Sequence, residues 1–383
     1  MNETDAAAGP AALAVNPSAC IDARSEMAAC AKCADVCPEE CLKVSGRAIH
    51  VDEPACVECG LCAAVCPSSA ITLGAYQEGR IGDILEAELS KSENAVLYCR
   101  KSALDGHGHF KCLGALTGAR MVNLALSGAA SITLKGACGE CGIYSGKAQI
   151  QKAVDAANYT LGKIGASPAV VFEPDAGKSV ERKKSAEISS RRGFLAGFAR
   201  IAVKQAVSKI RIYNIVAAPN GWLAPIQTPS RKRMLNRNVK AAAGEQAVFS
   251  ESESLFRMVE VAENCSLCNA CSAYCPTGAL ARKDYPDRIA IEFTAALCVK
   301  CHGCAGLCPE KAISYAEQFS ASAALAETPQ TKAERGKSEC VSCMKPFVPV
   351  EDGQTSCKAC MKVDKFQKHL FSMYVSERRS HES

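Results

Sequence analysis

Short apolar runs alternate with longer amphipathic segments in the middle of the chain. The runs at 95–98, 131–134 and 169–172 have the length of strands, whereas 115–128 and 147–164 carry apolar residues at helical spacing. Strands that alternate with helices predict a parallel α/β unit. Ligands of such units gather beyond the carboxyl ends of the strands, so the segments after these runs are candidates for chemistry.

Outside this central region, the pattern of apolar and polar residues is less regular. Met1–Ala19 contains Ala, Pro and acids but no basic start followed by an apolar core, which predicts a disordered N-terminus rather than a secretory signal. Residues 320–338 are rich in Ala, Ser, Glu and Lys and predict a flexible linker. No run reaches the roughly 18 apolar residues that a membrane helix needs. At 383 residues, the chain is long enough for two to four domains.

The cysteines add candidate ligand sites to this pattern, because the chain has 25 cysteines at regular spacings. Two complete runs, Cys265-x2-Cys268-x2-Cys271-x3-Cys275-Pro276 and Cys298-x2-Cys301-x2-Cys304-x3-Cys308-Pro309, have the pattern of a two-cluster ferredoxin. Each run in that pattern gives three thiolates to one [4Fe–4S] cube and its fourth to the other. The pattern predicts site A, made of Cys265, Cys268, Cys271 and Cys308, and site B, made of Cys298, Cys301, Cys304 and Cys275. A thiol-rich core or a disulfide framework is the alternative, and ligand spacing favours a reducing, cytoplasmic compartment.

The N-terminal region repeats this pattern with one defect. Its second run, Cys56-x2-Cys59-x2-Cys62-x3-Cys66-Pro67, is complete, but its first run begins with Met27 in place of a cysteine. Cys20 and Cys41 are the candidates for the missing ligand. Cys41 occupies a position where the other three runs have Ala, and free Cys behaves as a small apolar residue.

Cys20 is therefore the predicted ligand, through an enlarged loop to Cys30. Site C is then Cys20, Cys30, Cys33 and Cys66, and site D is Cys56, Cys59, Cys62 and Cys37. A [3Fe–4S] or missing cluster, or ligation by Cys41, are the alternatives. The apolar residues after the runs, Leu42–Val44, Ile71–Leu73 and Ile313–Tyr315, predict the short strands of a ferredoxin-like fold.

Four more cysteines lie where the central unit should bind its ligand. We expect Cys99, Cys112, Cys138 and Cys141, called site E, at one edge of its sheet. They suit a [2Fe–2S] or [4Fe–4S] cluster, with zinc, a redox dithiol and a structural role as alternatives. His107 and His109 lie close enough in sequence to contribute, although loop histidines are more often solvated.

The central unit also resembles a known electron-transfer domain. Cys99, the Lys111-Cys112-Leu-Gly segment and the glycine-flanked Cys138/Cys141 pair are similar to the small iron–sulfur subunit that links methanogen-type hydrogenases to heterodisulfide reductase. The resemblance covers about 80 residues, 94–174. It implies an electron-transfer relay with a [2Fe–2S] centre.

The net charge of +5 is unevenly distributed. Between Lys178 and Lys240 there are 15 Lys/Arg against two acids, so the rest of the chain is mildly acidic. Residues 194–211 predict a basic, imperfectly amphipathic helix. Residues 191–240 are accordingly a candidate contact for an acidic partner or an anionic membrane surface, or a helix that covers the chain's own domains. Without interleaved aromatics, no nucleic-acid binding is expected.

One motif in this connector has two interpretations. Ser190-Arg191-Arg192-Gly193-Phe194-Leu195 matches the twin-arginine export motif, but it lies in the middle of the chain and basic residues interrupt the apolar segment after it. The same motif, a Pro/Trp loop around Trp222 and the paired four-cysteine runs resemble the cytoplasmic nitrate-reductase accessory ferredoxins over residues 190–316. That resemblance implies a cytoplasmic location and a molybdoenzyme partner.

The last cysteines form a different kind of site. Cys340-x2-Cys343-x13-Cys357-x2-Cys360 has the spacing of a tetrahedral thiolate site, called site Z, which most often holds structural zinc. Rubredoxin-like iron is the alternative. A closed site of this kind would stabilise a small docking module and carry out no chemistry.

Together the patterns predict an α+β multidomain chain that resembles the multi-cluster polyferredoxins. We expect two bacterial-type 2[4Fe–4S] ferredoxin-like modules, a central parallel α/β domain and a C-terminal zinc-ribbon-like knuckle. The predicted segments are a disordered 1–19, a ferredoxin module at 20–76, the α/β domain at 77–174, the basic connector at 175–245, a second ferredoxin module at 246–319, the linker at 320–338 and the knuckle with its tail at 339–383.

The expected function is electron transfer to or from a protein redox partner such as a molybdoenzyme, formate dehydrogenase or hydrogenase. No nucleotide loop, flavin fingerprint or pterin motif is found, so a non-catalytic subunit is favoured over an enzyme. The alternatives are an assembly factor for a molybdoenzyme and a thiol/disulfide reductase that acts at Cys138 and Cys141.

Overall fold

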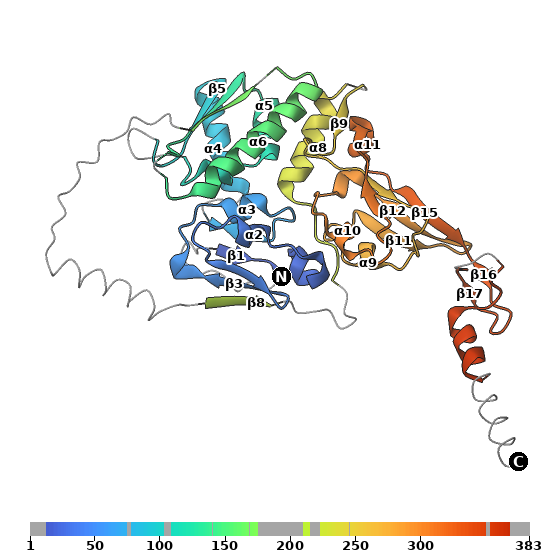
Figure 1. Cartoon of the computed structure of the whole chain (residues 1–383). Helices are drawn as coiled ribbons and strands as arrows, with labels where there is room; N and C mark the ends of the chain where they lie inside the picture. The colour runs from blue at the N-terminus through green and yellow to red at the C-terminus, as the bar shows by residue number, and fades with distance from the viewer. Residues whose placement is uncertain are drawn as a thin grey trace, which may run out of the picture.

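The computed structural model describes residues 13–74, 78–102, 109–139, 141–167, 169–174, 210–214, 223–244, 246–349 and 353–367. Within these ranges the chain has a mixed α/β architecture with two ferredoxin-like modules, a parallel three-stranded sheet and a C-terminal four-cysteine group (Figure 1). None of the helices in the described ranges is both long and apolar enough to cross a bilayer. The twin-arginine motif, residues 194–209 of the predicted helix and Trp222 lie outside the described residues. The last two residues of that predicted helix, Ile210 and Arg211, instead begin the strand β8 (Ile210–Asn214).

The N-terminal module consists of two small antiparallel sheets and short helices. One sheet pairs β1 with β4, and the other has the order β2-β3-β8. The elements are β1 (Leu13–Val15), η1 (Pro17–Ala19), α1 (Ile21–Arg24), η2 (Glu26–Ala28), α2 (Lys32–Asp35), β2 (Leu42–Ser45), β3 (Ala48–Asp52), η3 (Glu53–Ala55), α3 (Leu61–Val65), β4 (Ile71–Leu73) and β8 (Ile210–Asn214).

The strand β1 corrects part of the prediction for the N-terminus. Leu13 and Val15 are buried and pair with β4, although 1–19 is expected to be disordered from its composition. A buried, an exposed and a buried residue in succession fit a strand with one face toward the core. A run of three residues is too short to predict such a strand from the sequence. The predicted strands at 42–44 and 71–73 are present as β2 and β4.

The middle domain has the predicted parallel sheet. Its strand order is β5-β6-β7, and α5 and α6 pack together while α4 contacts β5. The 14-residue helix α4 was not predicted. The elements are α4 (Glu78–Lys91), β5 (Asn94–Tyr98), η5 (Leu113–Ala115), α5 (Gly118–Leu126), β6 (Ser131–Lys135), α6 (Tyr144–Lys163) and β7 (Val170–Glu173).

The second ferredoxin-like module repeats the first with larger sheets. The pair β10–β13 corresponds to β1–β4, and β11-β12-β15 corresponds to β2-β3-β8. A further pair joins β9 to β14. The elements are β9 (Val248–Ser250), β10 (Val259–Val261), α9 (Ala270–Ala273), β11 (Leu280–Asp284), β12 (Arg288–Phe293), η6 (Ala295–Leu297), α10 (Gly303–Leu307), β13 (Ile313–Tyr315), β14 (Gln318–Ser320), α11 (Ala321–Ala324) and β15 (Gln330–Gly336).

The segment 320–338 is not the flexible linker that its composition predicts. Residues Gln330–Gly336 form β15, which pairs antiparallel with β12 along its whole length. The buried residues of β12, such as Ala290 and Ile291, need a neighbour on that side, and a polar edge strand satisfies their backbone groups. Polar composition alone does not distinguish such a strand from a linker.

The helix α8 (Ser230–Ala242) links the three larger parts of the molecule (Figure 1). Arg231 Nη1 donates to Ala63 O of the N-terminal module at 3.3 Å. Asn236 Nδ2 donates to Ala296 O of the second ferredoxin module at 2.7 Å, and Asn238 Nδ2 donates to the Asn123 side chain on α5 at 3.1 Å. One side of this end of the basic connector therefore packs against the other parts of the molecule, while Arg233, Arg237 and Lys240 on the same helix stay exposed.

The C-terminal knuckle projects from the rest of the structure (Figure 1). It contains the short antiparallel pair β16 (Ser338–Glu339) and β17 (Pro346–Phe347), and a helix over residues 358–367. The four cysteines of site Z come together between these pieces.

Candidate iron–sulfur and metal sites

Sites A and B are formed as the sequence predicts. The four cysteines of site A line one cavity together with apolar side chains such as Val261 and Ile291. The four cysteines of site B line another, together with Ile21 and Phe293. Each cavity thus combines three thiols of one run with the last thiol of the other.

A repeated backbone turn places these thiols. Leu267 and Asn269, and likewise Lys300 and His302, have positive φ at equivalent positions around the second cysteine of each run. Such left-handed residues reverse the chain, so that successive thiols point into one cavity. After the last cysteine of a run the chain turns again, and Ala312 N–H donates to Cys308 Sγ at 3.2 Å.

Site C contains Cys20, as the enlarged loop predicts. The thiols that act electrostatically on Cys33 are those of Cys66, Cys20 and Cys30. Burial raises the pKa of Cys20 to about 11 and that of Cys33 to about 12, because a thiolate loses its hydration there. Met27, which occupies the ligand position of the repeat, is 69 % exposed and does not reach the site. Ligation by Cys20 stays a prediction, and these interactions place its thiol near those of the other three cysteines of site C.

Site D holds a fifth thiol, Cys41, which the sequence favoured as a substitute for alanine and kept as the alternative ligand of site C. Cys37, Cys56, Cys59 and Cys62 line one cavity, and the buried Cys41 lines it as well. Cys41 Sγ lies 3.4 Å from Cys37 Sγ. Its hydrogen bonds lower the pKa of Cys37 to about 6 and that of Cys56 to about 7, since a thiol donor favours a thiolate acceptor. The only sequence signal was a cysteine at a position where the other runs have alanine.

Site E lies at the carboxyl edge of the parallel sheet. Cys99 N–H donates to Lys135 O at the end of β6, and Cys138 N–H donates to Pro174 O just beyond β7. The Cys112 thiol interacts electrostatically with Cys141 and Cys138, and burial raises its pKa to about 12. These interactions join Cys112, Cys138 and Cys141, while Cys99 comes directly after β5 at the same edge.

His109 does not complete site E. His109 Nδ1 accepts from Tyr98 N–H at 3.1 Å, and Nε2 lies 3.0 Å from Glu88 Oε1. Both ring nitrogens of His109 are therefore engaged away from the cysteines. His107 lies outside the described residues.

Site Z differs from the other sites in its compactness. The four Sγ atoms lie within 4.8 Å of one another, and the Cys343–Cys357 pair is 3.9 Å apart. A tetrahedral ion with metal–sulfur bonds of about 2.3 Å needs sulfur–sulfur distances of about 3.8 Å. The Cys357 N–H donates to Cys340 Sγ at 3.2 Å and lowers the pKa of that thiol to about 6. Among the described residues, no other group of cysteines, histidines or acids is as compact, so site Z alone has single-ion geometry.

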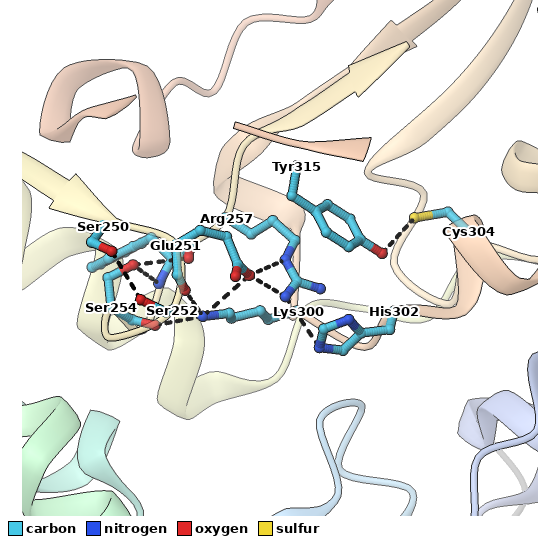
Figure 2. Close-up of polar contacts among 10 residues, drawn as sticks. Ser250, Glu251, Ser252, Ser254, Arg257, Lys300, His302, Cys304 and Tyr315 are labelled. Carbon is cyan, nitrogen blue, oxygen red and sulfur yellow. Dashed lines mark hydrogen bonds and ion pairs between the residues drawn. The ribbon is translucent and has the colours of Figure 1, made fainter. Parts of the chain in front are cut away.

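A network of charged and aromatic side chains covers site B (Figure 2). Arg257 Nε donates to Glu251 Oε1 at 2.8 Å, and its guanidinium lies 3.8 Å from the centre of the Tyr315 ring. The Tyr315 hydroxyl lies 4.0 Å from Cys304 Sγ. Lys300 Nζ donates to Ser254 O at 2.9 Å and pairs with Glu251 at 3.4 Å.

Two parts of the chain match known protein families. Residues 246–313 match the family model of the 4Fe-4S dicluster domain, and residues 49–72 match that of the 4Fe-4S binding domain. No curated protein and no solved structure matched the chain. The first match contains all of sites A and B, and the second contains Cys56, Cys59, Cys62 and Cys66. The chain therefore carries iron–sulfur domains of the ferredoxin type, a class that transfers electrons.

The cysteine sites fit the groups that these domains imply. Iron–sulfur clusters need thiolate ligands, apolar surroundings and N–H groups directed at sulfur. Sites A, B and D are apolar cavities that each hold their four predicted cysteines, and Ala312 and Ala70 donate N–H···S bonds at sites A and C. When bound, such a cluster takes up and releases single electrons, and the protein sets its position and potential.

Proposed function

We propose that this chain is an electron-transfer protein whose sites form one line, in the order A, B, C, D, E. In this proposal [4Fe–4S] cubes occupy sites A to D, an iron–sulfur cluster occupies site E, and zinc occupies site Z. The observation that carries the proposal is that neighbouring sites lie side by side. Cysteines of sites A and B, of C and D, and of D and E interact electrostatically, and the loop after Cys20 lies against the cavity of site B. Contacts within and between the modules support each step of the line.

Within each ferredoxin-like module the two sites are adjacent. Cys271 of site A acts on the Cys304 thiol of site B. Cys33 of site C acts in the same way on the Cys62 thiol of site D. Both pairs come from the equivalent short helices, α9 with α10 and α2 with α3, which pack against each other.

Sites B and C meet through the enlarged loop between Cys20 and Cys30. Ile21 of this loop lines the site B cavity. A Cβ atom added to Gly303 on α10 would lie 3.3 Å from Ile21 Cγ2 and 3.9 Å from Ala28 Cβ, which shows how closely the loop approaches. The inserted residues thus serve two purposes, because they bring Cys20 to site C and join the two modules.

Sites D and E meet through Cys59 and Cys112. These two thiols interact electrostatically, and with Leu61 they form one buried apolar cluster. Lys111, next to Cys112, pairs with Glu58, next to Cys59. The middle domain is thereby held against the end of the N-terminal module that carries site D.

The two ends of the line are the proposed points of exchange with a partner. Site A reaches the surface, since Cys268 is exposed. Site E would exchange electrons at the sheet edge of the middle domain. The resemblances to the nitrate-reductase accessory ferredoxins and to the hydrogenase-linked subunit favour a cytoplasmic oxidoreductase as the partner, such as a molybdoenzyme, a formate dehydrogenase or a hydrogenase.

The proposal is tested with the full chain and a candidate partner purified under anaerobic conditions. We expect a stoichiometric complex whose turnover requires the chain and is abolished by Cys62→Ser, which interrupts the line at site D. Cys360→Ser, outside the line, should leave electron transfer in place. Transient binding to the partner's apo-form without electron transfer would favour an assembly factor instead. Turnover that survives Cys62→Ser with site D empty would contradict the linear order.

A further inference from the structure

Buried cations are concentrated at one of the four cube sites. Among the described residues, the buried lysine and arginine side chains are those of Arg24, Arg120, Lys232 and Arg257. Arg120 belongs to the middle domain, where it donates to Ala115 O at 2.9 Å. The other three surround site B although they come from different parts of the chain, namely α1, α8 and the segment before β10.

Lys232 is the most unusual of these residues. It is 7 % exposed, and its ammonium lies 4.1 Å from the centre of the Phe256 ring. Within the described part of the chain, Nζ has no hydrogen-bond partner, and no acid pairs with it. The attraction that favours its charged form comes from Cys298 of site B, which carries negative charge as a cluster ligand. Burial lowers the pKa of Lys232 to about 8, so the ammonium persists at neutral pH.

Arg257 presents a second buried nitrogen without a partner. Its Nε and Nη2 atoms bind Glu251, and Nη2 also lies 3.1 Å from His302 Nε2 (Figure 2). Its Nη1 atom is buried and has no hydrogen-bond partner among the described residues. Arg257 lines the site B cavity and acts electrostatically on Cys298. A buried N–H group of a charged side chain is costly to leave without a partner unless negative charge lies beside it.

Arg24 adds a third charge from the other module. It is 1 % exposed and donates to three neutral carbonyl groups, with Nε bound to Ser18 O at 2.8 Å and Nη1 to Leu223 O at 3.2 Å. It interacts electrostatically with Cys275 of site B. Because carbonyl groups carry no net charge, these hydrogen bonds do not neutralise the positive charge of Arg24, which can therefore act on site B.

At the other cube sites the cations that these contacts include are only partly buried, and acids act beside them, as Glu58 does beside Lys111 at site D. At site C, Lys32 and Asp22 act on Cys30 with opposite signs. At site D, Glu58 acts on Cys56 and disfavours added negative charge. At site A, the partly exposed Arg335 acts on Cys265, while Glu310 lines the cavity. Around site B, Glu251 is the one nearby acid that these contacts include, against Arg24, Lys232, Arg257 and Lys300.

We propose that Lys232, Arg257 and Arg24 make site B the most easily reduced of the four cube sites, so that it collects electrons at the junction of the two ferredoxin-like modules. Reduction adds one negative charge, and buried cations favour that change more strongly than exposed cations do. One electron moves from site A or site C to site B, and the donating site is oxidised by one electron. The inference rests on the proposed function, because it requires cubes at these sites.

The test is a redox titration of the full-length holoprotein with dithionite, followed by electron paramagnetic resonance. In the wild type, the first signal to appear should be lost or altered by Cys301→Ser at site B and retained in Cys271→Ser at site A. Lys232→Met should lower the reduction equilibrium constant of that first signal about tenfold, a shift of about 59 mV for one electron. Lys232→Arg, which keeps the charge, should restore it.

The matched control is Lys240→Met on the same helix, because Lys240 is exposed and pairs with Glu327 at 3.2 Å. It should leave all midpoints unchanged. A first signal that is lost in Cys271→Ser but kept in Cys301→Ser would overturn the inference, as would an unchanged midpoint in Lys232→Met with full iron content. Absence of any reducible cluster in the wild type would instead refute the proposed function. If Lys232→Met does not load iron, the Cys301→Ser and Cys271→Ser comparison still decides.

Discussion

At the scale of single residues, two cysteines outside the regular runs have different environments. Cys20 lies among the thiols of site C, where Met27 is turned out to solvent. Cys41 lies against two thiols of site D, which already has four cysteines. We therefore predict that Cys20 completes site C, whereas Cys41 adds a hydrogen-bond donor to site D.

This difference leads to a prediction for paired variants. Cys20→Ser should lose one cluster, about four irons per chain, because an alcohol is a weak substitute for thiolate at iron. Cys41→Ala should keep all its iron, since alanine occupies this position in the other runs. Anaerobic iron analysis of the two variants measures the effect. Loss of a cluster in Cys41→Ala and not in Cys20→Ser would reverse the assignment.

At the scale of elements, helix α6 controls the space around site E. A Cβ atom at Gly146, near the start of this helix, would lie 2.8 Å from Cys112 Sγ. Real Cβ contacts are essentially never that short, so the sulfur would have to move. Gly162 lies on the same helix and has nothing within 4 Å of such an atom.

The two glycines make a matched pair of substitutions. Gly146→Ala should displace Cys112 and lose the iron of site E, while the four cube sites keep theirs. Gly162→Ala should keep every cluster and stabilise the helix by about 1 kcal/mol, because alanine is the better helix former. Iron analysis together with thermal unfolding measures both effects. Full iron at site E in Gly146→Ala would show that Cys112 is not a ligand.

Some of the strands could be predicted from the sequence and others could not. The parallel sheet was predicted because its strands, such as β5 and β6, are apolar runs that alternate with helices. The strands β8 and β15 were missed because each joins the edge of a small sheet far from it in sequence. Edge strands bury little, so their polar residues look like connector sequence.

The cysteine sites also have features that could be predicted from the sequence and features that could not. The quartets of sites A and B could be predicted, because ligand spacing is encoded within each run. The proximity of Cys59 to Cys112, and of Lys232 to Cys298, could not be predicted, because each pair joins residues from separate modules. Local spacing predicts single sites, whereas the order of sites depends on how the modules pack.

At the scale of the whole molecule, the modules are arranged so that each site lies beside the next. The loop between Cys20 and Cys30 joins the two ferredoxin-like modules, and α8 contacts all three larger parts. The knuckle projects away from this assembly and is not part of the line (Figure 1). A single molecule could thus carry electrons over a longer distance than a small ferredoxin does.

The central claim is that four cubes and one further cluster share this chain, and the most direct measurement is anaerobic iron, sulfide and zinc analysis of the purified full-length protein. We expect about 16 irons from sites A to D, about two to four more from site E, a matching amount of acid-labile sulfide, and one zinc at site Z. An iron content of about eight or less in fully loaded protein, with sites C and D empty, would contradict it.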